Sequence, residues 1–242
     1  MLVSILLLAL SACETAPRQP KVSDAPKVML WAWERPEDLR YIDTATTGVA
    51  FLAQTLTLEG DDVRYAPRRQ PLELKETTYL IAVTRIETIR KTENRPTYSP
   101  DQTARTVALI VDTMERPNVR GVQIDFDAVV SERAFYRRLV AELRKSLPAG
   151  TPLTMTALAS WCVGETWLND MDVDEAVPMA FEMGADTERV RSYIKSGQDW
   201  TVPLCRESYG LSVDEPAIDG IRPERRVYRW SGTQWKNRQR SP

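Results

Sequence analysis

Short runs in which apolar side chains alternate with polar ones recur along the chain, and they predict the strands of a sheet. The clearest run covers residues 119–128, and its centre reads Val122, Gln123, Ile124, Asp125, Phe126 and Asp127. Because the side chains of a strand point alternately to its two faces, this run predicts one apolar and one polar face. An amphipathic helix is expected after Ser131, with apolar residues at every fourth position: Phe135, Leu139, Leu143 and Leu147.

Similar apolar runs predict the other strands. Five are expected at 28–33, 48–52, 78–83, 153–158 and 175–181, and two less regular ones at 201–210 and 226–230. The segments between them predict a short helix at 34–38, a hairpin within 54–76, and helices over 100–117 and 186–197.

Repeated strand–helix units leave two architectures, a closed barrel and an open doubly wound sheet. The first strand is not followed by the glycine-rich turn with which an open sheet of this kind holds a dinucleotide. Polar or aromatic residues stand at the ends of several strands, where parallel barrels carry their active sites. We therefore predict an α/β fold, a TIM-type (β/α)8 barrel whose last strands are irregular.

Composition narrows the possible chemistry. Histidine is absent from all 242 residues, which excludes Ser-His-Asp and Cys-His nucleophile systems and the usual zinc sites. Acid–base chemistry must therefore rest on Asp, Glu, Tyr, Lys or Cys. A formal net charge of -2 argues against a general nucleic-acid binder. The main function that we predict requires neither a cofactor nor a bound metal.

The N-terminus predicts export. Residues 1–12 contain an apolar run too short to span a bilayer and are expected to be a signal peptide. The sequence Leu10-Ser11-Ala12-Cys13 resembles a bacterial lipobox, which implies a lipid on Cys13 and a membrane anchor. Glu14 is not the aspartate of an inner-membrane retention signal, so the outer membrane, facing the periplasm, is the expected location. The alternative is that this stretch is an N-terminal segment of the core.

Three segments then divide the chain. Residues 13–26 are polar and rich in proline, and they predict a flexible tether behind the lipidated cysteine. Residues 27–242 are expected to form a single barrel domain with a basic C-terminal tail. The two cysteines of this domain, Cys162 and Cys205, predict either a disulfide of an oxidising compartment or two buried thiols.

Gln123, Asp125 and Asp127 are spaced by two, so all three side chains should point to the same side of their strand, with neighbours about 6–7 Å apart. Inside a barrel, the last of them would lie at the rim where a substrate binds. Two carboxylates this close repel each other when both are ionised, so one of them should keep its proton more readily. The alternatives are a strand-end turn and a structural pair bonded to backbone amides.

Aromatic side chains at strand ends suggest a sugar ligand, because flat indole rings stack on pyranose faces. Trp31 and Trp33 share one face of the first strand, and Trp161 follows the fifth. Most tryptophans simply pack cores, and this is the alternative for each of them. Arg85, at the end of the third strand, is expected either to bind a carboxylate, from Asp125 or from an acidic sugar, or to lie on the surface.

The stretch from Gly121 to Asp127 resembles the Asp-rich fourth-strand motif of chitinase-type glycoside hydrolases. This resemblance implies that Asp127 is the acid that protonates the glycosidic oxygen and that Asp125 is its partner. Residues 178–182 resemble the Met-x-Tyr-Asp segment of the sixth strand, which brings in Met179 and Glu182. The run 122–184 is similar to a bacterial family known as domain of unknown function 3142, which is thought to be barrel-shaped and related to those hydrolases.

The chain departs from the chitinase motif at three positions. Gln123 stands where the motif has its first aspartate, Asp127 is one methylene shorter than the usual glutamate, and Phe181 replaces a tyrosine that helps to hold an acetamido group. A second carboxylate is then expected to act beside Asp127. Glu34 and Glu182 are the best placed by strand position, followed by Glu215.

Three functions follow from this sequence. The first is a lipid-anchored glycoside hydrolase that acts on a polysaccharide or other glycan. Its expected catalytic residues are Asp125, Asp127 and Glu182, and its expected substrate-binding residues are Trp31, Trp33, Gln123, Trp161 and Met179. The second is a catalytically inactive barrel that binds a glycan or a partner. The third is a metal-dependent transferase that holds a divalent cation through Asp-x-Asp.

Overall fold

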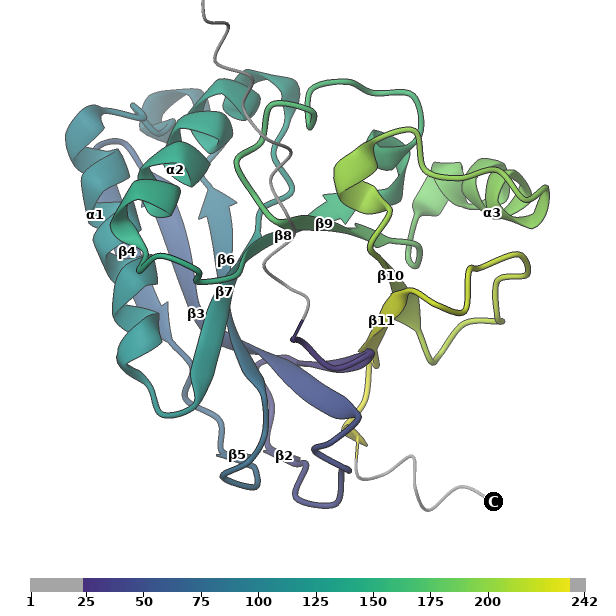
Figure 1. The fold of residues 1–242 in the computed structure, drawn as a ribbon. Coiled ribbons are helices and arrows are strands. Elements are labelled where there is room, and N and C mark those ends of the chain that lie inside the picture. The colour runs from purple at the N-terminus through teal and green to yellow at the C-terminus, as the bar shows by residue number, and fades with distance from the viewer. Residues whose placement is uncertain (1–23, 236–242) are drawn as a thin grey trace, which may run out of the picture.

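A computed structural model describes residues 24–235, and these residues form a closed barrel of eight parallel strands (Figure 1). The strands, in order around the ring, are β1 (Val28–Ala32), β3 (Thr47–Glu59), β6 (Leu80–Thr88), β7 (Val119–Asp125), β8 (Leu153–Leu158), β9 (Glu175–Met179), β10 (Ser208–Ser212) and β11 (Arg226–Trp230). Strand β1 pairs in parallel with both β3 and β11, and this double pairing closes the ring. The predicted barrel is confirmed.

Helices cover only part of this barrel. The α-helices of the described residues are α1 (Pro100–Val111), α2 (Arg133–Ser146) and α3 (Thr187–Lys195). Helices α1 and α2 flank β7 in the chain and lie together on one side of the ring, and α3 lies on the other side (Figure 1). The remaining connections between barrel strands contain no α-helix within residues 24–235.

One predicted helix is a strand. Residues 34–38 contain β2 (Glu37–Asp38), which pairs in parallel with β5 (Leu72–Glu73). Proline at position 36 disfavours a helical conformation of the residue before it. The backbone N–H groups of Glu37 and Leu39 instead donate to carbonyls of the β5 segment.

The excursion predicted within 54–76 is a hairpin, as expected. Strand β3 runs seven residues past its predicted end at Leu52 to Glu59, and its second half pairs in antiparallel fashion with β4 (Asp62–Pro67). The turn passes through Gly60, whose φ of +52° is readily adopted by glycine. This hairpin carries Arg68, which reaches the segment after β1.

The apolar faces lie where the sequence places them. The four periodic positions of α2, Phe135, Leu139, Leu143 and Leu147, are all buried against the outside of the sheet. Helix α1 begins as predicted, because the Ser99 hydroxyl accepts a hydrogen bond from the backbone N–H of Gln102 at 3.1 Å. The start of α2 differs: Ser131 lies in a preceding 3₁₀ turn, and Glu132 accepts from the Val129 N–H at 2.8 Å.

The end of the barrel at which the strands begin is closed by a buried ion pair. Arg226 donates to Glu175 at 3.1 Å, and burial raises the pKa of this glutamate. Arg226 also binds the carbonyls of Ala25 and Pro26. The last two residues of the expected tether, Ala25 and Pro26, therefore contact the barrel. Any opening to the interior must lie at the other end.

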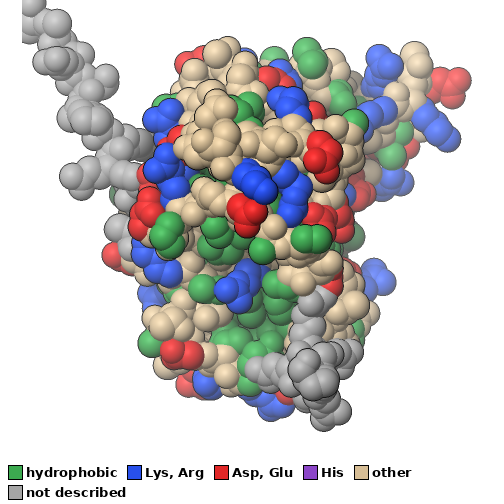
Figure 2. All heavy atoms as spheres, turned by 90° about the vertical axis from the view of Figure 1, so that its right-hand side faces the viewer, with side chains coloured by type: hydrophobic (Ala, Val, Ile, Leu, Met, Phe, Trp, Pro, Cys, Tyr) green, Lys and Arg blue, Asp and Glu red, His purple; other side chains and the backbone are tan. Residues whose placement is uncertain are grey.

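Among the described α-helices, only α3 reaches the outer wall formed by β10 and β11, where its Arg191 lies at the edge of a hollow. Figure 2 views the molecule from this side and shows hydrophobic side chains in a shallow hollow with charged groups around them. This hollow is lined mainly by apolar residues: Ala180, Leu211, Val213, Pro216, Ala217, Ile218, Ile221 and Val227. Within residues 24–235, no helix has the length and apolar character needed to cross a bilayer. The expected signal peptide, Cys13 and the end of the basic tail lie outside the described residues.

Candidate functional site

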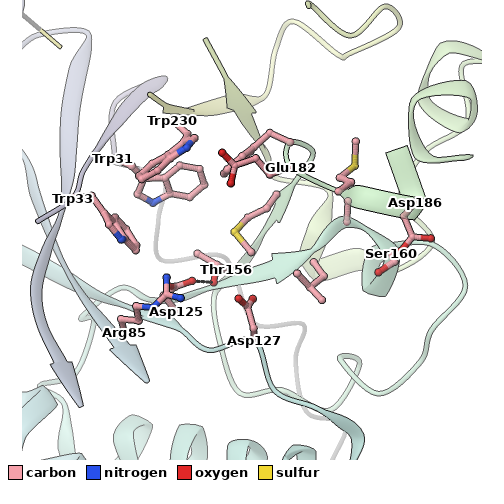
Figure 3. A pocket seen from close by; sticks show the side chains of 15 residues that line it. Trp31, Trp33, Arg85, Asp125, Asp127, Thr156, Ser160, Glu182, Asp186 and Trp230 are labelled. Carbon is pink, nitrogen blue, oxygen red and sulfur yellow. Dashed lines mark hydrogen bonds and ion pairs between the residues drawn. The ribbon is translucent and has the colours of Figure 1, made fainter. Parts of the chain in front are cut away.

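A cavity of about 380 Å³ opens at the end of the barrel where the strands finish (Figure 3). Side chains from or just beyond six strands contribute to its wall. They are Trp31, Trp33, Arg85, Asp125, Asp127, Thr156, Leu158, Ala159, Ser160, Met179, Phe181, Glu182, Met183, Asp186 and Trp230. The cavity therefore lies where the polar strand ends predicted a site.

Asp125 is the buried carboxylate of this cavity. It is the last residue of β7 and is 5% exposed. The Thr156 hydroxyl donates to its Oδ1 at 2.7 Å, and Arg85 donates to its Oδ2 at 3.3 Å. Burial raises the pKa of Asp125 to about 6, and the charge of Asp127 adds to this, whereas Thr156 and Arg85 oppose it. Asp125 thus keeps its proton more readily, as expected, but because of desolvation more than repulsion.

Asp127 is the exposed member of the pair. It follows the end of β7, so the strand is three residues shorter than the predicted 119–128. Its backbone carbonyl accepts a hydrogen bond from Arg90 at 3.0 Å. Its carboxylate receives no hydrogen bond from any residue between 24 and 235, so this group is available to a ligand.

Tryptophans form one wall of the cavity. Trp31, 2% exposed, lies deepest, and the half-buried rings of Trp33 and Trp230 meet edge to face with centroids 5.4 Å apart. Phe181 stacks against Trp230 at 6.2 Å with an interplanar angle of 16°. Figure 3 shows the three indoles on one side of the cavity. Trp230 is not among the site residues expected from the sequence, although its place at the end of the last expected strand is a usable signal.

Gln123 does not line the cavity, contrary to its expected contact with substrate. It is fully buried one layer below Asp125 on the same strand face. Its Oε1 accepts a hydrogen bond from Trp31 Nε1 at 2.8 Å, and its Nε2 donates to the Thr154 hydroxyl at 3.2 Å. Gln123 therefore orients the deepest indole of the wall from beneath.

Trp161 also lies outside the cavity. A 3₁₀ turn, Ala159–Cys162, follows β8 and turns this indole into the core, where it is 4% exposed and meets Trp167 edge to face at 4.9 Å. Cys162, at the end of the turn, forms a disulfide with Cys205. Ala159 and Ser160 of the same turn line the cavity instead. The expected sugar contact of Trp161 is thus replaced by core packing.

Glu182 faces the cavity from beyond β9, next to Met179 and on the other side from Asp125 and Asp127 (Figure 3). Its φ of +50° is uncommon for a residue with a side chain. The Glu215 carboxylate accepts a hydrogen bond from the Glu182 N–H at 2.8 Å and so supports this backbone conformation. Glu215 itself does not line the cavity.

The structure also places two other carboxylates, Glu34 and Asp186, differently from the sequence-based expectation. Glu34 is turned away from the cavity, because its Oε1 accepts hydrogen bonds from the backbone N–H groups of Arg69 and Gln70 at 2.9 and 3.1 Å. Asp186 lines the cavity and was predicted only as a helix cap. It also pairs with Arg189 at 2.8 Å.

A second hollow of about 300 Å³ lies beside the first and shares Arg85, Asp125 and Asp127 with it. Its other wall is polar and includes Glu87 and Arg90. The acid pair therefore lies between two hollows, and an extended ligand is able to occupy both.

The described residues contain no group of three or more Cys, Asp or Glu side chains placed to hold a metal ion. The Asp-x-Asp motif supplies only two carboxylates to the cavity, and Asp125 already binds Thr156 and Arg85. The metal-dependent transferase alternative gains no support from this arrangement.

No protein-family model matches the chain, and a search of curated proteins gives no match either. Among solved structures, the spore cortex-lytic enzyme SleL of Bacillus cereus is 18% identical, with 77% of this chain and 51% of that chain covered and a TM-score of 0.46. The enzyme SleL of Bacillus megaterium QM B1551 is 12% identical, covering 77% and 50%, with a TM-score of 0.47. The chitinase domain of the spore coat protein CotE from Clostridium difficile is 9% identical, covering 91% and 69%, with a TM-score of 0.43.

This chain spans about half the length of the two SleL structures. At these TM-scores the likeness supplies no residue correspondences. The assignment of the barrel rests instead on the strand pairing of the chain itself.

Proposed function

We propose that this protein is a glycoside-hydrolase-like barrel that binds a glycan in the cavity and cleaves it with Asp127 as the acid. One observation carries the proposal. An exposed carboxylate without a hydrogen-bond partner in the described chain, Asp127, lies beside a buried carboxyl group whose pKa burial raises to about 6, Asp125, in a cavity walled by indoles. The resemblance of the β7 sequence to the chitinase motif implies the same two roles. We also propose that residues 122–184 place the chain in the family known as domain of unknown function 3142.

In the proposed reaction, Asp127 gives its proton to the glycosidic oxygen as the bond from this oxygen to the anomeric carbon breaks. A water oxygen then bonds to the anomeric carbon, and the proton of that water passes to Glu182, from which it returns to Asp127 through solvent. In its protonated form, Asp125 adds no negative charge to the wall beside Asp127. During both steps, the indole rings of the cavity wall stack on one face of the sugar ring.

The test is turnover of a glycan panel, followed by the release of reducing ends. Asp127→Asn is expected to abolish turnover while binding, measured by tryptophan fluorescence, persists. Asp101→Asn is the matched control, because Asp101 lies on the surface of α1 and has a side chain that is 79% exposed. Turnover that survives Asp127→Asn, or a panel that is neither bound nor cleaved, overturns the proposal.

The second candidate is a barrel that binds glycans without cleaving them. The observation that favours it is the short side chain of Asp127, which reaches one methylene less far into the cavity than a glutamate, while the indole wall is intact. A misplacement of about 1 Å can cost about a hundredfold in rate. Binding that Asp127→Asn does not weaken, with no turnover on any glycan, supports this candidate.

We further propose that the protein is exported and anchored through a lipid on Cys13, facing the periplasm from the outer membrane. The Cys162–Cys205 disulfide supports export, because structural disulfides persist in oxidising compartments. Incorporation of labelled fatty acid into the wild type, and its loss in Cys13→Ser, is the expected result. Labelling that is equal in both proteins contradicts the anchor.

A further inference from the structure

The cavity has far more negative than positive charge. Four carboxylates line it, against the single guanidinium of Arg85. That guanidinium is already bound on both sides, by Asp125 at 3.3 Å and by Glu87 at 3.2 Å. An anionic sugar therefore meets excess negative charge and finds no unpaired cation, so the acidic-sugar role considered for Arg85 is not supported by its surroundings.

The cavity also offers more hydrogen-bond acceptors than donors. The Thr156 hydroxyl donates to Asp125, and the Trp31 Nε1 donates to Gln123, so neither donor is available to a ligand. Phe181 brings a ring without a hydroxyl. The carbonyl oxygen of an acetamido group is an acceptor; the lining offers it the Ser160 hydroxyl and the Trp33 indole N–H, whereas four carboxylates offer acceptors.

Glu182 supplies an acceptor that the protein does not use. It is exposed to the cavity, and no residue between 24 and 235 donates a hydrogen bond to its carboxylate. Its left-handed backbone conformation is maintained by Glu215 through the main-chain N–H, which leaves the Glu182 side chain free. Asp186 adds a carboxylate to the same lining, near Ser160 in Figure 3, and shares its charge with Arg189 at 2.8 Å.

Building on the proposed function, we propose that the cavity selects a glycan with free amino groups, in which a hexosamine packs against the tryptophan wall and its ammonium group faces Glu182 and Asp186. An ammonium has three donors and no acceptor, which complements this set of carboxylates. The sugar faces remain apolar enough to stack on Trp33 and Trp230.

Three oligosaccharides of equal length and linkage isolate this preference. Cello-, chitosan and chitin oligosaccharides differ only in a hydroxyl, an amino or an acetamido group on each ring. In weakly acidic buffer of low salt, the chitosan oligomer is expected to bind about tenfold more tightly than the other two, measured by calorimetry. The preference should disappear near 1 M salt, where the Debye length falls to about 3 Å.

Two variants locate the preference in the cavity. Glu182→Gln and Asp186→Asn should each lower the ratio of chitosan to cello-oligosaccharide affinity about threefold. The surface variant Asp101→Asn should leave this ratio unchanged. A preference that both cavity variants retain, or that Asp101→Asn reduces equally, overturns the inference.

The outcomes separate this inference from the function on which it rests. Equal binding of the three oligomers, together with Asp127-dependent cleavage of any glycan, refutes the amino-sugar preference and leaves the hydrolase intact. Absence of both binding and turnover across the panel refutes both.

Discussion

Replacing Asp125 by asparagine should change how the stability of the protein depends on pH. The carboxyl group of Asp125 is 5% exposed, and its pKa is raised from 3.8 to about 6, chiefly by burial. Between these two values the folded chain binds a proton that the unfolded chain has lost. Stability from this group is therefore full below pH 4 and is lost as the pH rises through about 6.

The size of the effect follows from the shift. A difference of about two pKa units, at 1.36 kcal/mol per unit, corresponds to about 3 kcal/mol. Asp125→Asn has the same shape and does not titrate. The free energy of unfolding of the wild type, minus that of the variant, should thus fall by about 3 kcal/mol between pH 4 and pH 8.

Urea denaturation followed by tryptophan fluorescence at several pH values measures this difference. Asp127→Asn is the matched control, because it removes the same charge at an exposed position and keeps the buried carboxyl. It should retain most of the wild-type pH dependence, reduced only by the lost repulsion from Asp127. If the free energy of unfolding of the wild type depends on pH in the same way as that of Asp125→Asn, then Asp125 is not a buried, proton-binding group.

Three further predictions concern the scaffold around the cavity. Gln123→Leu leaves Trp31 Nε1 without its acceptor and should cost about 1–3 kcal/mol in chemical denaturation; an unchanged midpoint would mean that this hydrogen bond does not stabilise the fold. Gly210→Ala brings a Cβ to within 2.8 Å of the Trp31 ring and should cost about 1–3 kcal/mol and weaken glycan binding, whereas wild-type affinity would show that the indole moves freely. Cys162→Ser with Cys205→Ser opens a link between residues 43 apart and should cost about 4 kcal/mol, and the reasoning fails if reductant destabilises the double variant as much as the wild type.

The sequence predicts most of the barrel strands, but the strength of alternation does not decide how accurate the bounds are: the clearest run, β7, ends three residues before its predicted end. The bounds expected for β8 and β11 are those of the structure, and the acid pair lies at the mouth as its spacing indicates. The helical expectations fail at residues 34–38, where proline and a short strand pairing that is distant in sequence determine the conformation. Such pairing leaves no periodic signal in the chain.

Alternation of apolar and polar residues predicts the face of a strand on which a side chain lies, but not its depth within the barrel. Gln123 and Asp125 share a strand face, but one step along the strand, about 6–7 Å, separates the floor below Trp31 from the open cavity. Likewise, Trp161 is only a residue away from Ser160, and the turn direction alone decides which of them faces the ligand site. Trp230 reaches the cavity only because β11 pairs with β1 and closes the ring.

The double pairing of β1 has a consequence for how this chain reaches its native state. One neighbour of β1 follows within some twenty residues, whereas the other, β11, lies about two hundred residues further on. Until β11 arrives, a growing chain carries an almost finished sheet with two bare edges, a form prone to pairing with other molecules. Assembly must therefore end with the stretch that also carries Trp230, so a chain truncated before Arg226 loses its folding cooperativity and its ligand wall in the same step.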